Sequence, residues 1–161
     1  MKRTLAEATY AGALLAAAGA LAWATGRPLV FPSLGPSAYL LATAPERTSD
    51  RELLGGHAIG VLAGLVSYHA LAAGNGILVG FDPGGAVGAH VVASGVVSVV
   101  LTTAGMALTD ARHAPACATT LIVSLGLLPT LGDALVIAVG VSGLYAASVV
   151  AERLGFAGRP R

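Results

Sequence analysis

The sequence predicts an all-α membrane protein, and three observations lead to this prediction. Of its 161 residues, 55% are hydrophobic and only 11% are charged, with a mean hydropathy of +0.79. Soluble domains carry about a quarter charged residues, so a soluble fold is excluded. Apolar runs long enough to span a bilayer alternate with short polar turns. The 22 glycines favour close helix packing in lipid.

Six membrane crossings are expected within one transmembrane domain, residues 1–161. Four are expected as plain helices, at residues 8–25, 57–80, 86–109 and 134–151. The second and fifth, 29–45 and 113–128, contain helix-breaking prolines, so each is expected as an extended stretch followed by a half-helix. Six extended residues and a ten-residue helix reach about 35 Å, enough for a hydrocarbon core of about 30 Å.

The basic residues predict the orientation of these crossings. With both termini cytoplasmic and residues 46–52 as an inner loop, eight of the nine basic residues lie inside and only Arg27 lies outside. A four-crossing alternative would place Arg47 and Arg51 opposite the N-terminus. Three crossings per half make the second half an inverted repeat of the first, about 1–81 and 82–161, as in many transporters. We expect a multi-pass protein of the plasma (inner) membrane.

The two broken crossings predict a binding site for a small anion. Gly35-Pro36 and Ala114-Pro115 have the form of helix starts, with proline at the first helical position. Backbone N–H groups at a helix start attract anions. The main-chain donors are expected at Ser37, Ala38, Tyr39, Ala116, Cys117 and Ala118, with hydroxyl groups from Ser33, Ser37, Thr119 and Thr120. In the alternative interpretation these are proline-kinked helices without a site, capped by Ser33 and neighbouring backbone.

The four histidines are further candidates, because an ionisable group inside a membrane is often functional. His113 precedes the second half-helix and His57 lies at the inner end of the third crossing, so both are candidate pH sensors. A capping role for His113 is the alternative. His69 and His90 are expected to pack between helices. A haem or redox protein built on them is disfavoured.

Several function classes are excluded or disfavoured. The net charge of +1 indicates no nucleic-acid surface. All eight acidic residues fall at expected helix ends or turns, so a cation transporter is unfavoured and no metal or other cofactor is expected. The single Cys117 excludes an intrachain disulfide. No pair of nucleophile and base stands out, so we do not expect an enzyme.

Three stretches, residues 31–38, 55–60 and 113–121, resemble the HPP family of small integral membrane proteins. The family is named for a His-Pro-Pro motif, which reads His113-Ala114-Pro115 here, so its first proline is missing. Plant members are associated with nitrite movement across the chloroplast membrane. The resemblance therefore implies nitrite or a similar small anion, and it includes Gly35, Pro36 and Pro115 of the expected site.

The sequence thus predicts a transporter or channel for a small inorganic anion, with nitrite as the implied substrate. The alternative is a non-transporting membrane subunit or scaffold whose glycines bind a partner helix. Gly56, Gly60 and Gly64 form such a small-residue stripe on the third crossing. Apart from the lipid bilayer, the expected partner is a second copy of the chain, because six short crossings make a thin bundle.

Overall fold

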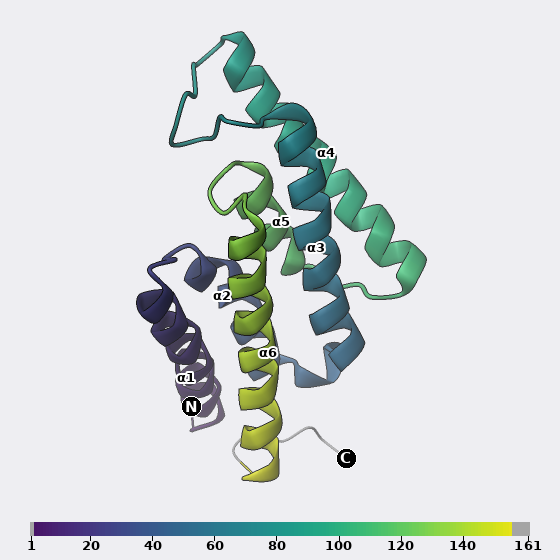
Figure 1. Ribbon diagram of the computed structural model, residues 1–161. Coiled ribbons are helices and arrows are strands. Elements are labelled where there is room, and N and C mark those ends of the chain that lie inside the picture. Colours follow the sequence, from purple (N-terminus) through teal and green to yellow (C-terminus); the bar gives the residue numbers. More distant parts are fainter. Residues whose placement is uncertain (1, 156–161) are drawn as a thin grey trace.

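The computed structural model describes residues 2–155, and its elements are all helical (Figure 1). An isolated bridge between Gly76 and Val79 is the extent of β-pairing in this part of the chain. The helices are α1 (Lys2–Thr25), α2 (Val30–Thr43), the 3₁₀ helix η1 (Pro45–Arg47), α3 (Asp50–Leu71), α4 (Ala86–Thr109), α5 (Ala116–Ser124) and α6 (Leu131–Arg153).

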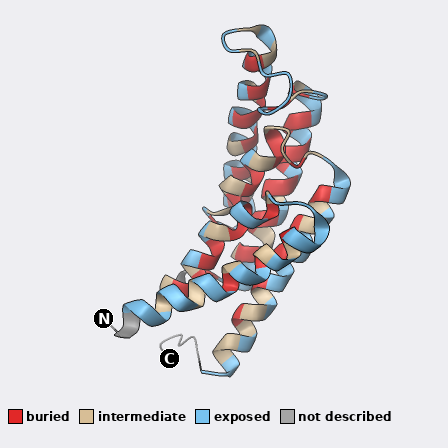
Figure 2. Ribbon diagram, turned by 90° about the vertical axis from the view of Figure 1, so that its left-hand side faces the viewer, coloured by how far each residue is buried: buried red, intermediate tan, exposed pale blue. Residues whose placement is uncertain are grey.

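Helix α3 lies at the centre of the bundle, packed against α4, α5 and α6. Helix α2 bridges α1, α5 and α6. The start of α1, the start of α3 and the end of α6 lie at the same end of the molecule (Figure 1). Buried residues concentrate on the inner helices, whereas α1 is largely exposed (Figure 2). An exposed apolar helix is expected in a protein whose solvent is lipid.

Four helices, α1, α3, α4 and α6, are long and apolar enough to cross a membrane. Each has 22 to 24 residues in its apolar span, about 33–36 Å of helix. The expected span at 86–109 coincides with α4. Helix α2 has 14 residues and α5 has nine, about 21 and 14 Å. Neither short helix alone crosses a hydrocarbon core of about 30 Å.

The expected break in the second segment is wrong, because α2 is one continuous helix that contains Pro36. Pro32 is its third residue, in the first turn, where a missing N–H costs little. Pro36 removes one internal hydrogen bond. Burial of Val30, Leu34 and Leu41 stabilises the helix despite this loss. In the fifth segment, by contrast, residues 111–115 are non-helical and precede the short α5.

Helix α3 begins at Asp50, so placing residues 50–52 in a loop is wrong. Ser49 and Glu52 form a capping box: the Ser49 N–H donates to Glu52 Oε2 (2.7 Å) and the Glu52 N–H donates to Ser49 Oγ (3.2 Å). This pattern, Ser-x-x-Glu before an apolar run, is a helix start that can be found in the sequence. The helix ends at Leu71, and a loop with Gly74 and Gly80 at positive φ fills residues 72–85.

The glycine stripe on α3 packs directly against the segment 113–123, which confirms its role in close packing. A Cβ atom at Gly56 would lie 2.6 Å from Cβ of His113, and one at Gly60 would lie 2.8 Å from the carbonyl oxygen of Ala116. At Gly64 it would lie 2.9 Å from the carbonyl oxygen of Thr120. Such distances admit only glycine, so the stripe sets the register of α3 against α5.

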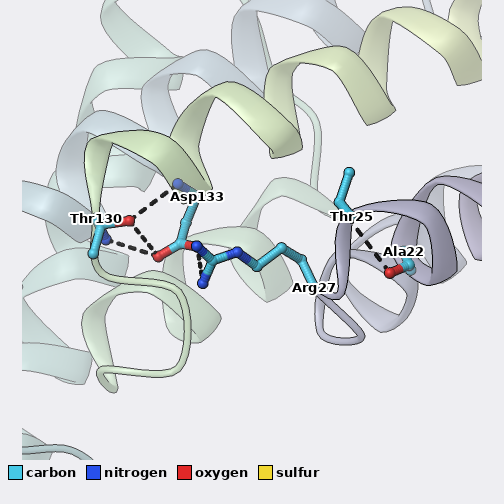
Figure 3. Close-up of polar contacts among 5 residues, drawn as sticks. All are labelled: Ala22, Thr25, Arg27, Thr130 and Asp133. Atoms are coloured by element: carbon cyan, nitrogen blue, oxygen red, sulfur yellow. Dashed lines mark hydrogen bonds and ion pairs between the residues drawn. The ribbon is translucent and has the colours of Figure 1, made fainter.

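An ion pair joins the turn after α1 to the start of α6 (Figure 3). Nη1 of Arg27 lies 2.9 Å from Oδ1 of Asp133. The Asp133 side chain is 2% exposed, whereas that of Arg27 is 47% exposed. Oδ2 of Asp133 accepts hydrogen bonds from the backbone N–H (3.0 Å) and the hydroxyl (2.6 Å) of Thr130, which completes the cap of α6. Arg27 is therefore a structural partner in this fold, at the end opposite the chain termini.

Replacing Arg27 by alanine is expected to lower the free energy of unfolding by about 1 kcal/mol, because it leaves a buried carboxylate oxygen without its partner. In an Asp133→Ala background the same replacement should have no further effect. The measurement is SDS-induced loss of helical circular dichroism for the two single variants and the double variant. Equal effects of Arg27→Ala in both backgrounds would show that the ion pair does not contribute to stability.

Candidate functional site

Four polar side chains meet in the core of the bundle, and we call them the Ser37–His57–His113–Thr119 cluster. Oγ of Ser37 lies 2.8 Å from Nε2 of His57 and 2.9 Å from Nε2 of His113. Nδ1 of His57 lies 2.8 Å from Oγ1 of Thr119. All four residues are buried, with at most 2% of their surface exposed. They form a continuous hydrogen-bonded chain in the core of the bundle.

Each member of the cluster comes from a different segment. Ser37 lies in the middle of α2, on the face that buries Leu34 and Leu41. His57 follows Gly56 on α3, and His113 lies in the non-helical stretch before α5. Because Gly56 has no side chain, the two imidazole rings approach to 5.2 Å between centroids, tilted by 60°. The glycine stripe of α3 thus positions the cluster.

The chemistry of this site is that of neutral hydrogen-bond donors and acceptors. Hydroxyl groups donate and accept, and a neutral imidazole does both through its two nitrogens. Within residues 2–155, no hydrogen bond links the cluster to a carboxylate, and no group of three or more metal-ligating side chains is found. The arrangement suits an anion or a proton better than a metal cation.

The hydrogen bonds of His57 to Ser37 and to Thr119 also match those of a catalytic base with its nucleophile and its orienting group. Two features argue against covalent catalysis. The orienting group is a neutral hydroxyl where a carboxylate would stabilise an imidazolium. The Ser37 hydroxyl is fully buried and shared with the second imidazole, His113. Binding and proton exchange fit this geometry better than attack on a substrate.

Two hollows flank the cluster. One, of about 460 Å³, lies between α3 and α6 and is lined by His57 together with apolar residues such as Ile137 and Val141. The other, of about 450 Å³, lies between α2 and the start of α5, where Pro36, Tyr39 and Pro115 contribute to its wall. Pro36 is adjacent in sequence to Ser37.

The structure brings three of the expected site residues together and adds one. Ser37 contacts both His57 and His113, and Thr119 joins the cluster through its contact with His57 of α3. Sequence reasoning considered His57 only as a pH sensor apart from the anion site. The sequence feature that could have identified His57 as a member of the site is its neighbour Gly56, the first glycine of the stripe. Close packing at Gly56 implies that the adjacent side chain contacts another core segment.

The expected main-chain donors are wrong. The N–H groups of Ser37, Ala38 and Tyr39 lie in the interior of α2, because this helix starts at Val30. Those of Ala116, Cys117 and Ala118 donate to the carbonyl groups three residues earlier, at 2.9 to 3.0 Å. Donors that already have partners are not free to hold an anion.

The remaining expected residues lie around the cluster without entering its hydrogen-bonded chain. The Ser33 hydroxyl donates to the Val30 carbonyl of its own helix (2.7 Å), and Tyr39 is 64% exposed. The hydroxyl of Thr120 is buried without a hydrogen-bond partner. Cys117 is a half-buried free thiol, and Gly35 is half-buried.

His69 and His90 lie outside the cluster. His69 is exposed and packs edge-on against the ring of Tyr68. His90 is exposed as well, and its Nδ1 lies 3.1 Å from the carbonyl oxygen of Leu71, which links α4 to α3. The contact of His90 agrees with the expected packing between helices, whereas the exposed His69 contacts its own neighbour on α3, so its expected packing between helices is wrong.

A family model described as "HPP, transmembrane region" matches residues 1–158, nearly the whole chain. Searches of the curated proteins and of the solved structures gave no match.

Proposed function

The chain belongs to the HPP transmembrane family, and from this premise we propose that it is a transporter or channel for a small inorganic anion, with the Ser37–His57–His113–Thr119 cluster as its binding site. The donors are side-chain hydroxyl and imidazole N–H groups, in place of the main-chain groups expected from the sequence. Nitrite is the anion to test first, because the resemblance to the plant members implies it.

The observation that carries this proposal is the buried polar cluster itself. Burying hydroxyl and imidazole groups in an apolar core costs free energy unless they are fully paired. Polar groups placed deep in a membrane protein commonly mark the path of a substrate. No carboxylate among residues 2–155 is hydrogen-bonded to the cluster, so a cation would find no direct carboxylate ligand there. When Nδ1 of His113 carries a proton, an anion would find that N–H without a hydrogen-bond partner among the described residues.

The two hollows support a route that leads to this site. The α3–α6 hollow is lined in part by His57, and the α2–α5 hollow is lined in part by Pro36, the residue before Ser37. Their walls are mostly apolar, so an anion would meet its first strong hydrogen-bond donors at the cluster.

We further propose that the chain makes six crossings as two inverted repeats, with both termini cytoplasmic, in the plasma (inner) membrane, and that it forms a homo-oligomer. In this topology the non-helical residues beside α2 and α5 complete the two short crossings. Both halves share the order long helix, short helix, long helix, and both third helices begin with a capping box. These shared features support the repeat.

Cysteine labelling in intact cells tests this topology. In a Cys117→Ala background, Glu46→Cys and Leu154→Cys are expected to react only with a membrane-permeant reagent. Leu78→Cys, 78% exposed in the loop before α4, should also react with an impermeant reagent added outside. Reaction of the cysteine at position 46 with the impermeant reagent would overturn the six-crossing arrangement.

Anion flux through the purified chain tests the proposed function. Liposomes containing the protein should take up nitrite under an imposed membrane potential or gradient faster than protein-free liposomes. A non-transporting subunit or scaffold, the alternative function, predicts equal uptake with and without protein. Because the proposal invokes no covalent step, no enzymatic turnover and no cofactor are expected.

A further inference from the structure

The cluster also has the connectivity of a proton relay. Its three contacts, Thr119 to His57, His57 to Ser37 and Ser37 to His113, are all 2.8 or 2.9 Å long and follow one another without a gap. Of the four imidazole nitrogens, Nδ1 of His113 is the one for which no hydrogen bond is found in the described part of the chain. The chain therefore has one bonded end, at Thr119, and one open end, at His113.

Counting protons shows that the cluster has two neutral arrangements. Ser37 has a single hydroxyl proton, so it donates to one imidazole and accepts from the other. In the first arrangement, Thr119 donates to Nδ1 of His57, Nε2–H of His57 donates to Ser37, and Ser37 donates to Nε2 of His113. In the second, every donor becomes an acceptor: Nε2–H of His113 donates to Ser37, Ser37 donates to His57, and Nδ1–H of His57 donates to Thr119.

Passing one proton through the cluster converts the second arrangement into the first. A proton that binds Nδ1 of His113 makes this ring an imidazolium, which passes its Nε2 proton to Oγ of Ser37. Ser37 passes its own proton to Nε2 of His57, so the positive charge moves to His57. The Nδ1 proton of His57 then passes to Oγ1 of Thr119 while the hydroxyl proton of Thr119 passes to water, which restores a neutral cluster. Only N–H and O–H bonds are made and broken, and one proton enters for each that leaves.

We propose that this relay couples anion movement to proton movement, so that the protein carries one proton with each anion. The inference rests on the proposed anion-transport function and specifies its coupling. The imidazolium formed at His113 or His57 supplies the positive charge that the buried site otherwise lacks. An anion bound beside it makes the loaded site electrically neutral, which lowers the cost of burial in an apolar core. Release of the anion and the proton leaves the cluster neutral again.

Few ionisable groups surround the relay. On α3, the carboxylate of Glu52 acts electrostatically on His113. On α4, the thioether of Met106 accepts the backbone N–H of His113 and carries no charge. Ionisable side chains on the other helices include Tyr39 of α2 (64% exposed), Cys117 of α5 (half-buried) and Asp133 of α6, which is paired with Arg27. The two imidazoles are thus the groups in the core that can carry the proton.

A pH gradient at zero membrane potential tests the coupling. The full chain is reconstituted in liposomes with equal potassium on both sides, valinomycin to hold the potential at zero, and equal nitrite concentrations inside and outside. Making the lumen alkaline is expected to drive net nitrite uptake above that of protein-free liposomes. Nitrate provides a second probe, because its acid form is negligible and does not cross lipid on its own.

Substitutions of the two histidines test whether these residues form the relay. His57→Gln and His113→Gln keep a hydrogen-bonding side chain but cannot carry the proton, so gradient-driven uptake should fall about tenfold or more. His69→Gln, on the exposed face of the same helix α3, is the matched control and should take up nitrite like the wild type. Ser37→Ala breaks the relay with the least change in volume and serves if a histidine variant fails to fold.

The outcomes separate the two proposals. Nitrite that moves under a membrane potential but ignores the pH gradient would overturn proton coupling and leave the anion channel in place. No uptake under either driving force would overturn both. Gradient-driven uptake that survives in both glutamine variants would remove the histidines from the coupling.

Discussion

Replacing Ser37 by leucine is expected to abolish anion flux while the chain still folds. The Ser37 hydroxyl lies between two imidazoles at 2.8 and 2.9 Å and is fully buried, so no space remains for a larger side chain. The leucine removes the central hydrogen-bonding group and fills the site with apolar atoms. Unpaired imidazole nitrogens and overpacking together should cost about 2–4 kcal/mol of stability. The measurement is nitrite uptake into liposomes by a variant that elutes as a single peak in detergent.

Ser33 provides the matched control on the same helix. It is also fully buried, one turn before Ser37, but its hydroxyl donates only to the Val30 carbonyl. Ser33→Ala should therefore keep wild-type flux, whereas Ser37→Ala should reduce flux about tenfold through the loss of hydrogen bonds to the site. Equal flux in the two alanine variants would mean that the anion path does not pass through the cluster.

The second large effect on stability and flux is expected for Gly60→Leu. The leucine side chain should push α3 away from α5. A Cβ atom there would lie 2.8 Å from the backbone oxygen of Ala116, and a backbone atom cannot rotate away as a side chain can. Overpacking of this kind costs about 3 kcal/mol. It also moves His57 away from Ser37 and His113, so flux should be lost together with stability. Loss of helical circular dichroism in SDS measures the stability.

Gly143 on α6 is the control for this change. It is exposed, and a Cβ atom there would have no neighbour within 4 Å. Gly143→Leu should leave both unfolding and flux close to those of the wild type, with a small gain from the better helix propensity of leucine. If Gly60→Leu unfolds at the same SDS concentration as Gly143→Leu, the close approach of α3 and α5 does not hold the bundle together.

Part of the candidate site could be predicted from the sequence. The broken or proline-containing segments directed attention to Ser37, His113 and Thr119, and the structure brings these three together. The main-chain N–H groups that were expected as anion donors are used instead within α2 and in the turn before α5. Proline statistics describe where a helix tends to start, whereas burial of Val30 and Leu34 decides whether a helix continues through a proline.

By itself, the sequence determined the membrane class, the helical content and the helix at 86–109, because transfer of an apolar run into lipid is a local property of that run. It also showed the glycine stripe and its role in close packing. Only the tertiary structure decided that His57 meets Ser37 and that Arg27 pairs with Asp133. Those contacts join residues distant in the chain, and they depend on the register in which helices pack, which no local pattern contains.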